Sequence, residues 1–202
     1  MFALIDNEQI TKHISGNKGI TIGDIQYPRS IFTLWSADKK KAIGIYEVVF
    51  DNANFKDQKY YNNTNQSFDF ADGVATASYG TATAKALADA NGTDEAGEEL
   101  DPVVVIEGLK TQHKRIIKQQ SSGLLIPTDW YVIKATEVES YSAPSAITTY
   151  RANVRTKSND MEVLIDACST VDELATLYEY VNTGTEENPV MERPLGEFPE
   201  AV

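Results

Sequence analysis

The sequence predicts an α+β protein in which a β-rich domain with hairpins precedes a module of three helices and a short strand. Residues 1–85 alternate short apolar segments with turn residues, as β-hairpins do. Residues 102–185 instead repeat apolar side chains at helical spacing. An acidic stretch, residues 86–101, lies between these patterns and is predicted to be a linker. A second acidic stretch, residues 186–202, is predicted to be a tail.

Two hairpins and one strong strand define the β-rich domain. One hairpin is expected to turn at Asp6-Asn7, between two short apolar segments. The clearer hairpin turns at Asp72-Gly73, a pair that is favoured in tight primed turns. Residues 45–50 are rich in β-branched and aromatic side chains and predict a strand between these hairpins.

The first predicted helix starts near Pro102 and stops around Leu125. Proline suits the first turn of a helix, because its missing N–H has no partner there. Pro127 restricts the residue before it to extended dihedrals, so the helix is expected to end before this proline. Residues 131–133 then predict a short strand or extended piece.

Two further helices are expected after Pro144. The second helix carries its apolar residues along one side: Ile147, Tyr150, Val154, Met161, Leu164, Ile165 and Cys168. Thr170 and Glu173 have the spacing of a capping box and predict the start of the third helix, which Gly184 closes.

The net charge of −12 lies mostly in the two acidic stretches. Residues 86–101 contain six acidic and no basic side chains, and residues 186–202 contain five acidic side chains against Arg193. Binding to nucleic acid is not expected, because phosphate contacts need clustered lysine and arginine. No apolar run approaches the roughly 20 residues that span a bilayer, and the apolar start lacks the basic flank of a signal peptide. No membrane partner is therefore expected.

The chain offers no constellation of residues for catalysis or metal binding. His13 and His113 stand alone in their halves, and a metal site needs further clustered ligands. The single cysteine, Cys168, allows no internal disulfide and falls on an apolar helix side, where it is expected to be a buried hydrophobe. We therefore expect no enzyme, no cofactor and no metal. Exposed aromatic residues of the first half, such as Trp35 and Tyr46, are candidates for an interface or a sugar site, although most such rings form cores.

The strongest pattern in the chain is paired leucines followed by two polar-aromatic motifs. Its residues are Leu124, Leu125, Thr128, Asp129, Trp130, Tyr150, Arg151 and Arg155. It resembles the C-terminal module of tail accessory and tail-fibre assembly proteins of tailed bacteriophages. In that module a helix ending in paired leucines precedes Thr-Asp-Trp, and the next helix carries Tyr-Arg and a further arginine. Residues 131–142 depart from the family, which often has a short proline-containing loop there.

The first half adds to this resemblance. Phe2–Ile5, Trp35-Ser36 and Ala42–Tyr46 look like the opening of small virion structural proteins of marine phages. The resemblance covers residues 102–182 and, more loosely, residues 1–80. Within the motif, we expect Trp130 to be turned back against the helices, and Asp129 to cap a helix or to pair with Arg151.

The resemblance implies a virion structural protein made in the host cytoplasm and located in the tail, neck or tail-fibre apparatus. Its expected partners are other tail proteins and copies of itself around a symmetry axis. Two alternatives remain open. One is a tail-fibre assembly chaperone that does not stay in the particle. The other is a receptor-binding or glycan-binding appendage module that uses the aromatic first half.

Overall fold

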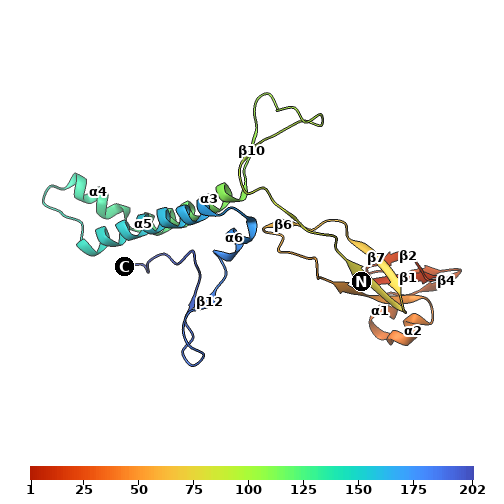
Figure 1. Ribbon diagram of the computed structural model, residues 1–202. Helices are drawn as coiled ribbons and strands as arrows, with labels where there is room; N and C mark the ends of the chain where they lie inside the picture. The colour runs from red at the N-terminus through yellow and green to blue at the C-terminus, as the bar shows by residue number, and fades with distance from the viewer. The chain divides into compact units, whose positions relative to one another are not determined.

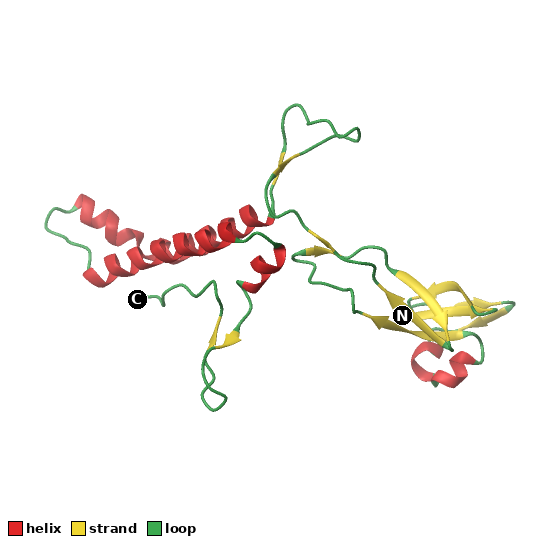
Figure 2. Ribbon diagram, in the orientation of Figure 1, coloured by secondary structure: helices red, strands yellow, loops and turns green.

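A five-stranded sheet forms the centre of the first unit of the chain. The computed structural model describes residues 1–202 and divides into two units, residues 1–84 and 85–202. In sheet order the strands are β2 (Gln9–Ile14), β1 (Phe2–Asp6), β5 (Ile45–Asp51), β8 (Val74–Ser78) and β7 (Ser67–Ala71). All pairs are antiparallel except β5 and β8, which run parallel (Figures 1 and 2).

Both predicted hairpin turns are confirmed by the backbone. Asn7 and Glu8 have φ angles of 49° and 61° between β1 and β2, and Asp72 and Gly73 have φ angles of 50° and 75° between β7 and β8. Two successive positive φ angles define the primed turn that matches the twist of the paired strands. The first turn is one residue later than the sequence predicts.

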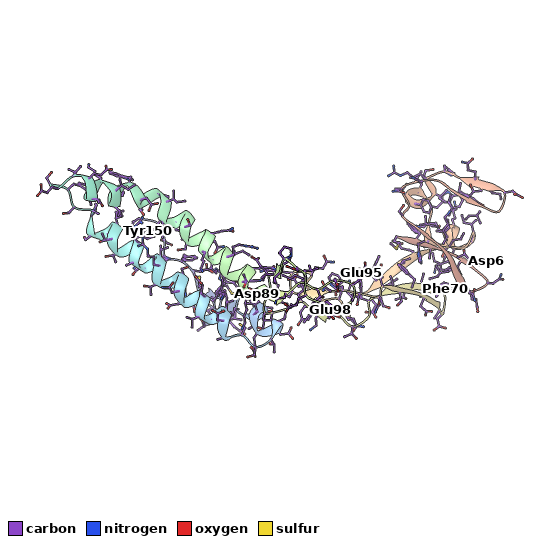
Figure 3. All side chains as sticks on the ribbon, turned by 90° about the horizontal axis from the view of Figure 1, so that it is seen from above. Asp6, Phe70, Asp89, Glu95, Glu98 and Tyr150 are labelled. Carbon is purple, nitrogen blue, oxygen red and sulfur yellow. The ribbon has the colours of Figure 1, made fainter.

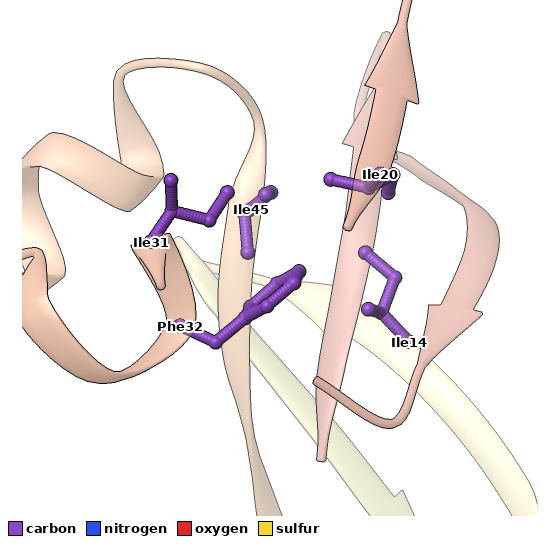
Figure 4. Close-up of a cluster of buried hydrophobic side chains, with 5 residues drawn as sticks. All are labelled: Ile14, Ile20, Ile31, Phe32 and Ile45. Atoms are coloured by element: carbon purple, nitrogen blue, oxygen red, sulfur yellow. The ribbon is translucent and has the colours of Figure 1, made fainter. Parts of the chain in front are cut away.

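The two faces of this sheet cover separate groups of buried side chains. On one face, Ile14 and Ile45 pack against residues of the flanking elements β3 (Ile20–Ile22), β4 (Ile25–Tyr27) and α1 (Ile31–Leu34) (Figure 4). The short helix α2 (Ala37–Lys41) lies beside them and places the Lys40 ammonium over the Phe2 ring. The other face buries Ala3, Val48, Ala75 and Ala77 under the partly buried rings of Phe68 and Phe70. The ring centroids of His13 in β2 and Phe68 in β7 lie 4.0 Å apart. The sheet is therefore curled, and its two outer strands approach each other.

The second unit is built on two long helices that lie side by side. α3 (Leu109–Leu125) and α5 (Ser145–Ala167) run antiparallel and bury one stripe each (Figures 1 and 3). The stripe of α5 follows most of the predicted residues, with Ile147, Tyr150, Val154, Met161 and Ile165 buried, whereas Leu164 was expected there and is exposed. The capping box at Thr170 and Glu173 is confirmed and begins α6 (Val171–Thr176).

The chain around Pro127 is helical, so the predicted strand at residues 131–133 is wrong. Ile126 keeps helical dihedrals (φ −50°, ψ −47°), and a short 3₁₀ turn, η1 (Ile126–Thr128), carries Pro127 in its first turn. A proline there sacrifices no hydrogen bond. The helix α4 (Asp129–Glu137) follows directly and contains residues 131–133.

The first predicted helix stops at Leu125 as expected, but its start and the end of the third predicted helix differ from the sequence prediction. α3 begins at Leu109 instead of near Pro102, and α6 ends at Thr176, well before Gly184. Gly184 lies in a hairpin between β12 (Val181–Asn182) and β13 (Met191–Glu192). Strand pairing between distant residues takes these segments out of the helices, and local periodicity cannot reveal it.

The two acidic stretches contain hydrogen-bonded structure. Residues 89–108 form a protruding arm in which β10 (Ala90–Asn91) pairs with β11 (Val105–Ile106) (Figure 1). The stretch expected as a linker is therefore mostly one side and the tip of this arm. In the C-terminal stretch, Leu195 is fully buried and its N–H donates to the Leu177 carbonyl.

In the first unit, β6 (Tyr61–Asn62) pairs with β9 (Thr83–Ala84).

Candidate docking site

The corner between α3 and α4 is held by a buried arginine from α5. The last carbonyls of a helix have no partner within the helix. Here the Nη1 of Arg151 donates to the Leu125 carbonyl oxygen at 2.9 Å and to the Thr128 Oγ1 at 2.6 Å. The hydroxyl of Thr128 itself donates to the Leu125 carbonyl at 2.8 Å. The corner is thus bonded across three elements.

The predicted pairing of Asp129 with Arg151 is confirmed. The Nη2 of Arg151 lies 2.8 Å from the Oδ1 of Asp129 at the start of α4. The arginine side chain is 8 % exposed, whereas the carboxylate is 47 % exposed. Because the carboxylate stays hydrated, the pair orients α4 more than it adds to stability. We call Leu125, Thr128, Asp129 and Arg151 the arginine clamp.

The remaining residues of the predicted motif have different positions around the clamp. Tyr150 is buried, and its hydroxyl donates to the Leu124 carbonyl at 3.4 Å. Leu124 and Leu125 are partly buried. Arg155 is exposed and donates only to the Arg151 carbonyl of its own helix, at 3.4 Å. Spacing alone therefore placed Arg155 in the motif, but the structure does not bring it into the clamp.

Trp130 does not return against the helices, so this part of the sequence prediction is wrong. It is 50 % exposed, and its ring contacts the neighbouring Tyr131 ring at a centroid distance of 3.9 Å. Ile126 and Ile133 are also exposed, by 62 % and 55 %. Positions four and three residues apart lie on one side of a helix. We call Trp130 and Ile133 of α4, together with Ile126 of the preceding η1, the α4 apolar face. Its exposure follows from the helical course of the chain.

This arrangement suits docking of another protein. Exposed apolar side chains that cluster on one face are typical of interaction surfaces. Tryptophan is the residue most enriched among those that dominate binding energies. The arginine clamp fixes the direction of α4, so Trp130 is presented on a rigid support. A pre-positioned side chain loses little entropy on binding.

The two aromatic candidates of the first unit do not form a shared surface. Trp35 is partly buried against the cluster of Figure 4, and its ring meets Tyr27 edge-on at 5.9 Å. Tyr46 packs on the opposite face of the sheet, edge-on to Phe70 at 4.7 Å. Both rings therefore contribute to cores, and neither is a flat exposed platform.

His113 and Cys168 are buried, whereas His13 is exposed on β2. His113 is buried, with its ring 4.8 Å from that of Tyr178, and His13 stacks on Phe68. Burial raises the pKa of the Cys168 thiol, and the Glu173 carboxylate adds to this effect. No group of three or more His, Cys, Asp or Glu side chains lies close enough to hold a metal ion. None of the helices is long and apolar enough to cross a lipid bilayer.

The arm is a second exposed surface, which the sequence analysis missed. Asp89 anchors its base to α3, because its carboxylate accepts from the Gly108 N–H at 2.8 Å and from the Thr111 hydroxyl at 2.9 Å. These bonds hold the pKa of Asp89 below its ordinary value. Residues 103–106 of the arm are four β-branched residues that are each more than half exposed. That run, beside an acidic stretch, was the signal in the sequence.

Comparison of the chain with protein-family models, curated proteins and solved structures found no match. The site is therefore defined by its own geometry.

Proposed function

We propose that this chain is a structural docking protein of a tailed-bacteriophage particle, placed in the tail, neck or tail-fibre apparatus. The observation that carries this proposal is the α4 apolar face, Ile126, Trp130 and Ile133, held outward by the arginine clamp. A large exposed tryptophan on a fixed helix is a costly feature in a protein that never covers it.

The resemblance to phage tail proteins gives the proposal its biological setting. The motif that carries this resemblance includes Asp129, Trp130 and Arg151, which belong to the clamp and to the apolar face. In this proposal the clamp residues set the direction of α4, and the face contacts a neighbouring protein of the particle.

The test is incorporation of the chain into particles of the phage that encodes it. We expect mass spectrometry of purified particles to detect the chain. We also expect Trp130→Ala combined with Ile133→Ala to reduce incorporation at least tenfold. The matched control is Val163→Ala on α5, which removes an exposed apolar side chain outside the face and is expected to leave incorporation unchanged.

Two results would overturn the proposal. A chain that is abundant in infected cells but absent from purified particles has no structural role, and this result favours an assembly chaperone instead. Unchanged incorporation of the double variant means that the α4 apolar face is not the docking surface. Circular dichroism of each variant shows whether α3 to α6 remain folded.

A further inference from the structure

The tip of the arm is acidic, so a surface that binds it is expected to be basic. Its tip, residues 92–101, carries five carboxylates and no basic side chain: Asp94, Glu95, Glu98, Glu99 and Asp101. None of them forms a salt bridge. Glu95 and Glu98 are labelled in Figure 3, together with Asp89 at the base of the arm.

The segment behind this tip, residues 103–106, ends in β11 and is apolar on both of its faces. Val103, Val104, Val105 and Ile106 are 57 %, 51 %, 58 % and 59 % exposed. β11 pairs with β10 along one edge only, and the other edge is free. A free edge with exposed β-branched side chains is a template for an added strand. Two arms repel each other at their acidic tips, so another arm is a poor partner.

The second unit is strongly acidic, so it offers little positive charge to this tip. It contains ten basic against 21 acidic side chains. The cations of α3 are already engaged within the unit: Lys114 with Asp166, Arg115 with Glu107, and Lys118 with Glu162. Arg151 lies in the clamp. The first unit, with eight basic against nine acidic side chains, is nearly neutral and is the better source of cations for the acidic tip.

The first unit has a groove with the complementary chemistry. Nine consecutive residues, from Lys12 to Ile20, line a cavity of about 180 Å³. Lys12 and Lys18 are exposed, form no salt bridge, and share the groove with His13 and with no carboxylate. The groove begins in β2, one of the two outer strands of the sheet, and continues through the loop that leads to β3; β7 approaches β2 at His13.

We propose that the arm of one copy of this chain docks on the Lys12–Ile20 groove of a second copy. β11 then lies along the groove, and the acidic tip faces Lys12 and Lys18. The proposal rests on the proposed structural function and names one partner within the particle. The contact is head-to-tail, because the arm and the groove belong to different units. Repetition of such a contact builds a ring or a filament.

The test is charge reversal in the purified full-length chain, followed by sedimentation velocity over a concentration series. We expect the wild-type chain to self-associate, and to do so less in about 1 M salt, where the Debye length is about 3 Å. Glu95→Lys with Glu98→Lys, or Lys12→Glu with Lys18→Glu, is expected to weaken self-association at least tenfold. Mixing the two variants is expected to restore association between unlike chains, because the unchanged acidic arm of the groove variant then meets the unchanged lysine groove of the arm variant.

Two matched controls carry the same charge changes elsewhere. Glu186→Lys with Glu187→Lys alters the loop between β12 and β13, and Lys39→Glu with Lys41→Glu alters α2; both pairs are exposed. Self-association is expected to remain as in the wild type. All of the substituted side chains are exposed, so circular dichroism and Tm are expected to stay at wild-type values.

Three results would overturn the inference: a wild-type chain that is monomeric up to its solubility limit, charge reversals that leave association unchanged, or a mixture that does not associate. A monomeric chain that is still found in particles refutes only the contact between copies. A chain absent from particles refutes only the structural function.

Discussion

Replacement of Arg151 by alanine tests the arginine clamp directly. The substitution removes hydrogen bonds to the Leu125 carbonyl and the Thr128 hydroxyl, and the ion pair with Asp129. A hydrogen bond to a charged group contributes about 1.5–3 kcal/mol. The Leu125 carbonyl keeps its bond from Thr128 and the half-exposed Asp129 regains water, so neither group is left buried without a partner. We expect the free energy of unfolding of the second unit to fall by about 3 kcal/mol.

The ion pair accounts for a minor share of this loss. Because the carboxylate of Asp129 is 47 % exposed, solvent screens its attraction to Arg151. Asp129→Ala is expected to cost about 1 kcal/mol, and the coupling energy between the two substitutions in a double-mutant cycle is expected to be about 1 kcal/mol or less. Arg155→Ala is the matched control. Its side chain is exposed and bonds only to its own helix, so we expect a change within about 0.5 kcal/mol.

The assay is urea unfolding, and each unit has its own fluorescent reporter. The two tryptophans of the chain, Trp35 and Trp130, lie in the first and the second unit. In a Trp35→Phe background, Trp130 reports the second unit alone, and far-UV circular dichroism follows its helices. Equal costs for Arg151→Ala and Arg155→Ala would refute the clamp. Strict additivity of the Asp129 and Arg151 substitutions would refute their pairing.

Three further substitutions or measurements probe the arm and the core. Gly108→Ala at the N-cap of α3 is expected to destabilise the second unit by more than about 1 kcal/mol in urea unfolding, because the added Cβ would overlap the backbone of Ala88. Gly123→Ala within α3, where a Cβ meets open space, is expected to stabilise the second unit by about 0.5–1 kcal/mol. Bonds from Gly108 and from the Thr111 hydroxyl lower the pKa of Asp89 below 3.8. The ionised Asp89 carboxylate therefore stabilises the fold at neutral pH, and this stabilisation is lost as the pH falls through the folded-state pKa. The difference in the free energy of unfolding between wild type and Asp89→Asn is expected to shrink in acid. The thiol of Cys168 is buried with a raised pKa, so iodoacetamide is expected to alkylate it far more slowly in the native chain than in denaturant, and equal rates would contradict its burial.

Much of the local structure was predictable because its causes lie close together in the sequence. The turn at Asp72-Gly73 follows from residues that tolerate positive φ angles, and Asn7 supplies one such residue at the first hairpin, where Glu8 takes the second position. The capping box of Thr170 and Glu173 is complete within four residues. The Asp129–Arg151 pair was one of two roles expected for Asp129 from the spacing, and it forms because α5 packs back along α3.

Other features of the site could not be predicted, because they depend on partners far along the chain. Trp130 was expected inside and is half exposed. Its direction depends on whether η1 continues the helical course through Pro127, and either outcome was compatible with the local sequence. The start of α3 depends on Asp89, which bonds Gly108 from 19 residues away.

The sequence by itself determined the α+β class, the order of the two structural patterns, and the turns and caps that punctuate them. These depend on side-chain periodicity and backbone preference, which act over a few residues. Only the tertiary structure decided what is exposed. In the folded chain the α4 apolar face is exposed, and the stretch expected as a linker forms part of an arm through the pairing of β10 with β11. Both outcomes depend on which distant segments pack or pair, since these contacts decide which apolar surface is removed from water.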